Sequence, residues 1–238
     1  MPFNLEKCKV MHFGKQNKCH KYHLNNTALG EAEEEQDLGI TVTSDLKASR
    51  QFRLAYNKAI RILGMINRTI KYKNKVILIN LYKSLVRPLL EYAAPAWSPQ
   101  YIKDKEFLEK VQHRRTRMIR GMKALQYEDR LNKLGIWSLE ERRNRADIIE
   151  VFKILNGHSS VSAGKFFEMH NNPRTRGYSK KLKKNRCNST ARQHFFTERV
   201  INRWNKLSQR SIDAKNILEF KKCLTMEKNN QMTFFYDS

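Results

Sequence analysis

Acidic residues are scarce in this chain. The 238 residues contain 23 Asp and Glu against 47 Lys and Arg, which gives a formal net charge of +24. Five of the acids lie together in EAEEEQD at residues 31–37, so the rest of the chain is even more basic. This imbalance predicts a polyanionic partner, with nucleic acid as the first candidate and an anionic membrane surface as the second.

Long apolar runs and clustered cysteines are also absent. The longest apolar run, residues 76–82, includes Asn80 and is too short to cross a bilayer, and no apolar secretory segment follows Met1. The four cysteines are scattered, which suits a reducing compartment. Apolar residues make up 40% of the chain, which is enough for a core. We therefore expect a soluble intracellular protein, in the nucleus or the cytoplasm, with no membrane partner.

Motifs for catalysis and for cofactors are missing as well. The sequence has no P-loop, no GxSxG nucleophile elbow and no HExxH pair. Cys8, His12, Cys19, His20 and His23 suggest a zinc site, but their spacing matches none of the usual ligand patterns. We predict no metal and no cofactor in this chain, and we assign these Cys and His residues to strands and turns.

Hydrophobic patterns predict a mainly α protein with a small β element at its N-terminal end. Short runs of β-branched and aromatic residues indicate strands within residues 8–43, which must pack on the following helices or on a missing part. Periodicity and capping residues predict helices at residues 50–69, 74–92 with a kink at Pro88, 102–122, 127–134, 138–157, 196–207 and 217–224. The tail after Lys228 is expected to fray.

These elements divide the chain into four expected regions. They are a β region, a helical domain, a basic loop or linker and a C-terminal helical region, at residues 1–44, 45–157, 158–192 and 193–238. The loop carries RTRGYSKKLKKNR at residues 174–186. Three interpretations of its cluster at residues 180–186 stay open: a nuclear address, a phosphate-binding arm and a solvated linker.

The apolar stretch LYKSLVRPLLEYAAPAWSP, residues 81–99, ends in a corner where Trp97 stands between two prolines. The three tryptophans, Trp97, Trp137 and Trp204, could stack on bases, as in single-strand binders. We favour core packing for two of them, because Trp204 lies in an apolar stripe and Trp97 can wedge between helices.

A first row of basic residues is a candidate nucleic-acid contact. On the helix expected at residues 50–69, one face is apolar and the opposite face carries Arg50, Arg53, Arg61 and Arg68. This row is predicted to contact phosphates without reading the base sequence. The alternative is a merely solvated face.

A second row lies on the helix expected at residues 102–122 and consists of Lys110, Arg114 and Arg117. For this row the two interpretations are balanced, because Glu106 and Glu109 are near enough to pair with it. Neighbouring Arg115 points to the apolar side and is expected to be structural.

Several motifs occur in a fixed order along nearly the whole chain. They are LEKCKVMHFG, EEEQDLGITVTSDLKAS, LYKSLVRPLLEYAAPAWSP, LEKVQHRRTRMI, YEDRLNKLGIWSLEERRNRADIIEVFKILNG and WNKLSQRSIDAKNILEFKKCL. Together they resemble the C-terminal part of reverse transcriptases (RNA-directed DNA polymerases) of LINE-type, jockey-like non-LTR retrotransposons. The resemblance implies the end of a polymerase palm at residues 1–44, a helical thumb-like domain at 45–157 and a C-terminal region.

The resemblance also implies roles for three residues. Lys7 matches the palm lysine near the incoming triphosphate, and Leu38 and Gly39 lie in the DLGI turn that helps to hold the primer end. The family's aromatic-Ala-Asp-Asp turn would lie just before the first residue, and the chain has no Asp-Asp dipeptide. Because polymerase chemistry needs two metal ions held by clustered carboxylates, Mg²⁺ in the full-length family enzyme, this chain alone is expected to be inactive.

The sequence therefore predicts a truncated reverse transcriptase that binds template and primer without performing the chemistry. One alternative is a longer, active polymerase product that includes the missing N-terminal portion. Another is a scaffold or interaction protein without a nucleic-acid role, and a product with no selected role is a third.

Overall fold

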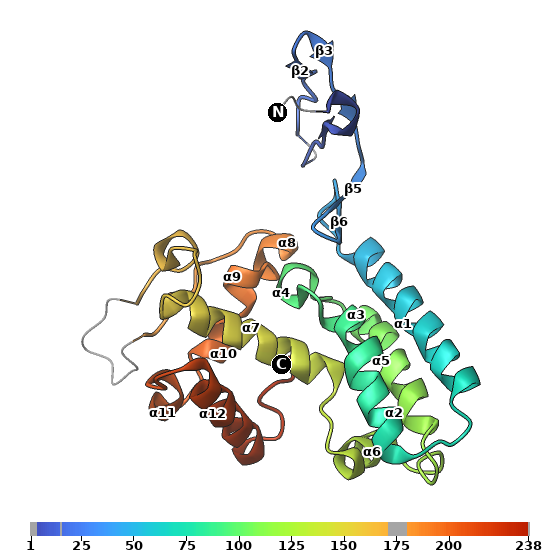
Figure 1. The fold of residues 1–238 in the computed structure, drawn as a ribbon. Coiled ribbons are helices and arrows are strands. Elements are labelled where there is room, and N and C mark those ends of the chain that lie inside the picture. The colour runs from blue at the N-terminus through green and yellow to red at the C-terminus, as the bar shows by residue number, and fades with distance from the viewer. Residues whose placement is uncertain (1–3, 15, 171–179, 238) are drawn as a thin grey trace.

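The computed structural model describes residues 4–14, 16–170 and 180–237, which form a helical body and a narrow N-terminal arm (Figure 1). Helices dominate and the strands are short, so the expectation of a mainly α protein is confirmed. In the described residues, no helix is both long enough and apolar enough to cross a membrane. The body contains two apolar cores, which share one long helix, α7 (Leu139–Leu155).

The arm consists of three separate strand pairs that follow a short 3-10 helix, η1 (Leu5–Lys7). The pairs are parallel β1 (Lys9–Val10) with β4 (Gly30–Glu31), antiparallel β2 (His23–Leu24) with β3 (Thr27–Ala28), and antiparallel β5 (Glu34–Asp37) with β6 (Ile40–Thr43). No described residue before Gln51 is buried. The arm meets the body at its base, where the Thr41 backbone N–H donates to Gln51 Oε1 at 2.9 Å.

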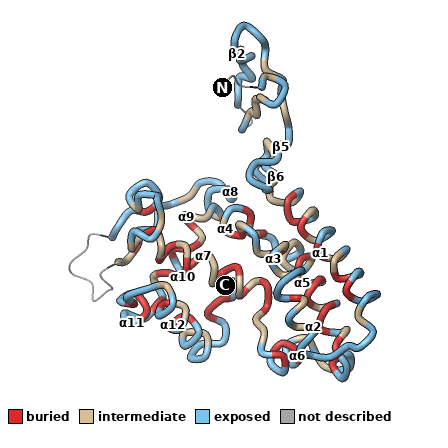
Figure 2. The backbone as a smooth tube through the Cα atoms, in the orientation of Figure 1, coloured by how far each residue is buried: buried red, intermediate tan, exposed pale blue. Residues whose placement is uncertain are grey.

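Helix α1 (Ser49–Thr69) follows the expected helix closely. Its apolar residues recur every three or four positions and are buried against the helices that come after it (Figure 2). These residues are Phe52, Ala55, Ala59, Leu63 and Ile66. These side chains begin the first core, which continues through the helices up to Leu139.

The second long helix is divided into α2 (Lys75–Leu81), the π-helical segment η2 (Tyr82–Val86) and α3 (Arg87–Glu91). Pro88 has no N–H, and its ring would meet the carbonyl four residues back in a regular helix. The widened turn relieves this conflict, because the Arg87 N–H donates to the Tyr82 carbonyl five residues back.

The π turn also shifts which residues face the core. Leu85 and Tyr92, which the regular pattern places inside, are exposed, and Val86 and Leu90 are buried instead. Leu89, which the regular pattern also places inside, is half-buried against the first core, so that pattern is wrong at Leu85 and Tyr92.

The proline-bounded corner packs as expected. Ala93 has a left-handed backbone (φ +48°) and starts the short helix α4 (Ala94–Trp97). Trp97 is buried in the first core, and its Nε1–H donates to the Tyr92 carbonyl at 2.7 Å. Core packing is also confirmed for Trp204, whose Nε1–H donates to the Lys180 carbonyl at 2.8 Å.

The next three helices lie close to their expected positions. They are α5 (Ile102–Arg117), which ends five residues early, α6 (Tyr127–Leu134) and α7. Gly135 closes α6 with a φ of +63°, and the capping box of Ser138 and Glu141 opens α7. Arg115 is buried over the Tyr82 ring, 5.4 Å from its centroid, which confirms its structural role.

The second core joins the C-terminal half of α7 to the end of the chain. Around it lie the short helices η3 (Ala163–Lys165), α8 (Thr190–Gln193), α9 (Phe196–Arg199), α10 (Ile201–Trp204) and α11 (Gln209–Ile212), and the longer α12 (Ile217–Asn230). The single helix expected at residues 196–207 is thus two short helices. The prediction of a frayed tail is wrong, because Phe234 and Phe235 are buried in this core.

The basic cluster at residues 174–186 lies partly outside the described residues, which resume at Lys180. Leu182 is buried in the second core, and its backbone N–H and C=O both bond to the Asn205 side chain, at 2.9 and 2.8 Å. This part of the cluster is therefore anchored to the body through its apolar residue.

Candidate nucleic-acid interface

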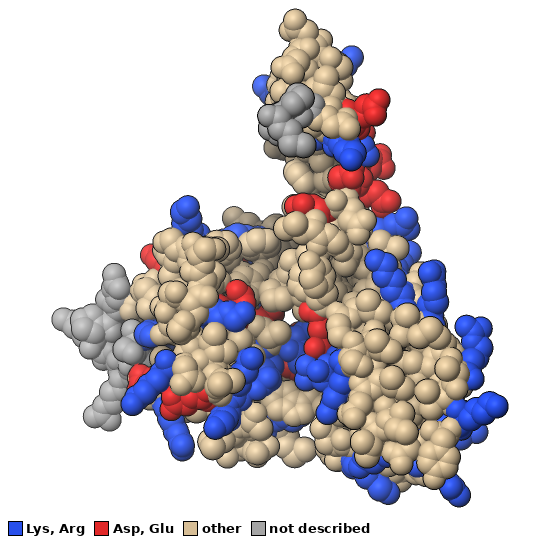
Figure 3. All heavy atoms as spheres, viewed as in Figure 1, with Lys and Arg blue, Asp and Glu red and all other residues tan. Residues whose placement is uncertain are grey.

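Arg53, Arg61 and Arg68 project from the side of α1 that faces away from the first core, and we call them the α1 stripe. All three are exposed, and no ion pair involves them among the described residues. Figure 3 shows Lys and Arg side chains along this outer edge of the body. At 1.5 Å per residue, successive stripe residues are about 12 and 10 Å apart along the helix axis.

Arg50 is the fourth residue predicted for this face, and it lies at the junction with the arm. Its Nε is 3.1 Å from Glu34 Oε2 on β5. The acidic side chains of the arm lie just beyond this end of α1 (Figure 3). Arg50 therefore already has a partner, and the acids of residues 31–37 bound the α1 stripe at its N-terminal end.

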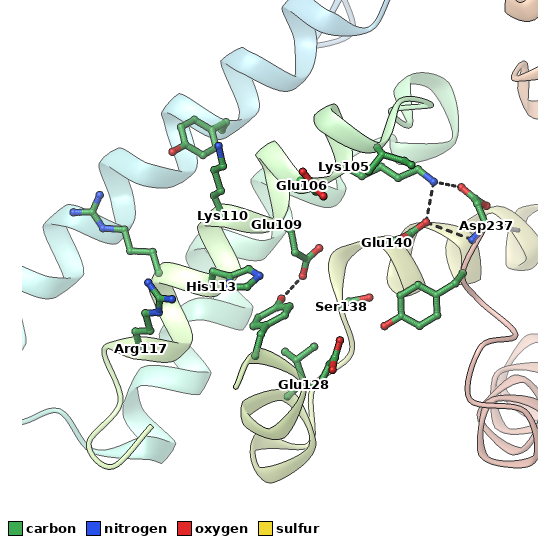
Figure 4. Close-up of a pocket in the computed structure, with 16 residues that line it drawn as sticks. Lys105, Glu106, Glu109, Lys110, His113, Arg117, Glu128, Ser138, Glu140 and Asp237 are labelled. Atoms are coloured by element: carbon green, nitrogen blue, oxygen red, sulfur yellow. Dashed lines mark hydrogen bonds and ion pairs between the residues drawn. The ribbon is translucent and has the colours of Figure 1, made fainter. Parts of the chain in front are cut away.

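Lys110, Arg114 and Arg117, which we call the α5 stripe, line a groove of about 980 Å³. The other walls of the groove come from α1, α6, the start of α7 and the C-terminal tail. In Figure 4, Lys110 and Arg117 point away from the side on which Glu140 and Asp237 lie. Like the α1 stripe, these three residues are exposed and form no ion pair in the described part of the chain.

The two acids expected to compete for the α5 stripe do not neutralise it. Glu109 accepts a hydrogen bond from the Tyr127 hydroxyl and another from the Leu139 backbone N–H, at 3.0 Å (Figure 4). Burial raises the pKa of Glu109, and the bonds from Tyr127 and Leu139 oppose that rise. Glu106 is exposed and forms no ion pair among the described residues.

Gln112 extends the bonds of Glu109 into a network that fixes the groove wall. The Tyr82 hydroxyl donates to Gln112 Oε1 at 2.6 Å, and Gln112 Nε2 donates to the Trp137 carbonyl at 2.9 Å. Through these bonds α6 and the start of α7 are held against α5, so the network positions the α5 stripe relative to the opposite wall.

Glu109→Ala is expected to destabilise the fold by about 2–3 kcal/mol, because it leaves the Tyr127 O–H and the Leu139 N–H without an acceptor. Urea denaturation measures this loss. The matched control is Glu106→Ala, one turn earlier on α5, with an expected change within about 0.5 kcal/mol. Equal losses in the two variants would show that the network contributes nothing specific.

The far end of the groove carries acids that have basic partners. Lys105 Nζ lies 2.8 Å from Glu140 Oε1 and also pairs with Asp237. Arg203 Nη2 contacts Asp237 at 2.6 Å. These pairs tie the C-terminal tail to α5 and α7 and neutralise the acids at this end of the groove.

The residues implied by the palm resemblance lie in two parts of the arm. Lys7 is exposed at the end of η1. Leu38 and Gly39 form the β5–β6 turn at the base, where the Tyr92 hydroxyl donates to the Leu38 carbonyl at 2.9 Å. Both turn residues have positive φ, +45° and +80°, which is the geometry of a type I′ hairpin turn. Leu38 is 81% exposed, so no packing compensates for its strained backbone.

Leu38→Asn is expected to stabilise this hairpin by about 0.5–1 kcal/mol, because Asn tolerates the left-handed conformation better than Leu. Amide hydrogen exchange in β6 should slow by roughly two- to fivefold. Gly39→Ala should change exchange in the opposite direction, and slower exchange in both variants would contradict this account of the turn.

Two residues beside the α5 stripe, His113 and Arg130, were not predicted from the sequence. His113 lines the groove between Lys110 and Arg117, and Arg130 is buried behind it on α6. Arg130 Nη2 lies 3.4 Å from His113 Nδ1. His113 could have been predicted from the sequence, because it lies within the basic row of α5. Arg130 could not, because it comes near His113 only where α6 folds back on α5.

The described residues contain no group of three His, Cys, Asp or Glu side chains that could hold a metal ion. His12 lies 3.8 Å from Glu31 on the arm, and Cys8 and Cys19 are free thiols. The structure thus brings together basic side chains over a groove and along α1.

Comparison of the chain with protein-family models, curated proteins and solved structures returned no match.

Proposed function

We propose that these residues bind a nucleic-acid duplex of template and primer, as the thumb-like C-terminal region of a LINE-type, jockey-like reverse transcriptase. The observation that supports this proposal is the pair of stripes on α1 and α5, six exposed bases that have no ion-pair partner in the described part of the chain. Of the nearby acids, Glu109 bonds to Tyr127 and Leu139 and Glu34 pairs with Arg50, while Glu106 and Glu128 form no ion pair with either stripe among the described residues.

The spacing of the α1 stripe suits a phosphate backbone. Its intervals of about 10–12 Å correspond to roughly three base-pair steps of 3.4 Å along the axis of a duplex. Contacts of this kind position the duplex and carry no sequence information, so the proposal predicts binding with little dependence on base sequence.

No chemical step is assigned to these residues. Nucleotide addition needs two metal ions between clustered carboxylates, and the 238 residues contain no Asp-Asp dipeptide. In this proposal the chain binds and orients the duplex, and the metal-dependent chemistry belongs to residues that it does not contain.

The test is the salt dependence of duplex binding, measured by fluorescence anisotropy with two duplexes of unrelated sequence between about 50 and 200 mM salt. With six phosphate contacts, the affinity should fall by about 10³-fold over this range, and similarly for both duplexes. A shallow salt dependence together with tight self-association would reject this function and favour a protein scaffold.

A further inference from the structure

Arg130 on α6 is buried without an anionic partner. Only 2% of its surface is exposed, and its Nε and Nη1 atoms have no hydrogen-bond partner in the described residues. Burial lowers the pKa of Arg130, and the charge of Arg117 lowers it further. Its guanidinium lies over the Tyr127 ring, 5.4 Å from the centroid, which offsets part of the cost of burying the charge. An anion bound nearby would offset more of it.

The groove reaches this buried charge through the ring of His113. His113 lines the groove and stacks on Tyr127, with 3.5 Å between ring centroids. Burial and the charges of Arg130 and Arg117 lower the pKa of His113, so its ring is neutral near pH 7. Because arginine can only donate, His113 Nδ1 is the acceptor of the contact with Arg130, and Nε2 carries the proton. His113 is therefore a donor with a positive charge behind it.

Arg117 lies one helical turn after His113 and lines the same groove. The titratable and charged groups around His113 are Glu109, Lys110, Arg114 and Arg117 on α5 and Tyr127, Glu128 and Arg130 on α6. Of the two carboxylates among them, Glu109 accepts bonds from Tyr127 and Leu139, and Glu128 is exposed and forms no ion pair among the described residues. The surroundings of His113 thus carry more positive than negative charge.

We propose that this end of the groove binds a phosphate group, with His113 and Arg117 as donors and Arg130 as a positioning residue behind His113. One phosphate oxygen accepts from His113 Nε2–H and a second accepts from the Arg117 guanidinium. Phosphates of nucleic acid are the expected source, and in this respect the inference rests on the proposed function. Free phosphate offers the same chemistry, so the experiment separates the two sources.

The experiment follows the histidine Cε1–H resonances by NMR from about pH 5 to pH 8, with the His113 signal assigned by His113→Gln. The protein is titrated alone, with inorganic phosphate, and with a short duplex. A bound phosphate favours the charged imidazole, so the pKa of His113 should rise by about one unit in at least one of the two titrations. A rise with the duplex alone identifies a nucleic-acid phosphate, and a rise with inorganic phosphate alone identifies a free one.

Arg130→Met separates this role from a structural one. The variant should bind phosphate at least about tenfold more weakly and should also have a higher melting temperature, because an unpartnered buried charge is removed. Arg130→Lys should retain part of the phosphate response, and Arg117→Gln should lose affinity without a gain in stability. Lys123→Met, on an exposed loop outside the groove, is the control and should change neither property.

The inference is overturned if His113 keeps its free pKa with both ligands, or if Arg130→Met melts earlier and binds normally. Salt-dependent duplex binding that persists in either case would leave the proposed function intact. If the wild-type chain does not bind the duplex but His113 responds to inorganic phosphate, the proposed function is rejected and the phosphate site is supported.

Discussion

Replacing Arg53, Arg61 and Arg68 together by alanine is expected to reduce the slope of log affinity against log salt by about 2.7 for a duplex ligand. Each phosphate contact releases about 0.9 counterion, so three lost contacts set this upper value. If counterion release is the whole effect, wild type and variant bind equally at about 1 M salt and differ by a factor of ten to the power 2.7 at about 0.1 M. Duplex affinity at about 0.1 M salt is then roughly 500-fold lower in the variant. Fluorescence anisotropy across a salt series measures both quantities.

A control of equal charge change is available on the same molecule. Lys47, Lys153 and Arg192 are paired with Asp45, Glu150 and Glu198 respectively, so their replacement by alanine also removes three positive charges. Since their charges already have partners, the slope should change much less. Similar slopes for the two triple variants would mean that net charge, and not the α1 stripe, governs binding.

Asp147→Ala is expected to destabilise the fold by about 3–5 kcal/mol. Asp147 on α7 is fully buried and accepts two hydrogen bonds from Arg199, at 2.8 and 3.0 Å. Arg199 Nη2 also donates to the Pro95 carbonyl of α4 at 2.8 Å, so one side chain connects three helices. Burial raises the pKa of Asp147, and Arg199 opposes that rise. Removal of the carboxylate leaves the guanidinium inside without its anion.

Urea denaturation measures the loss, and two variants give its cause. Glu150→Ala, one turn further along α7, breaks a half-exposed pair with Lys153 and should cost less than about 1 kcal/mol. The double variant Asp147→Leu with Arg199→Met removes both charges of this pair and should recover part of the stability. A double variant as unstable as Asp147→Ala would show that packing, and not the unpaired charge, determines the cost.

Helices with local end signals were predicted from the sequence most closely. Gly135 ends α6 and the Ser138–Glu141 box begins α7, and both signals act within a few residues of the backbone that they determine. The register after Tyr82 was missed for a different reason. Leu85 and Val86 are both apolar, so the pattern fits a regular helix and a π turn equally well, and the choice depends on packing around Pro88.

The candidate site divides in the same way. Both stripes follow from helical periodicity, because their members lie on one helix each. The pairing of Arg50 with Glu34 and the approach of Arg130 to His113 join different elements, and no spacing in the sequence encodes them. The tail was predicted to fray because chain ends are commonly poorly ordered. Phe235 is nevertheless buried beside Trp137, with 5.4 Å between the ring centroids.

The sharing of α7 between the two cores determines how the body should unfold. Leu139 at its start belongs to the first core, and Ile148 and Phe152 further along belong to the second. Neither core can lose this helix without exposing apolar surface of the other, so the body should melt in one cooperative transition. The arm has no buried residue among those described and should open independently at a much lower free energy.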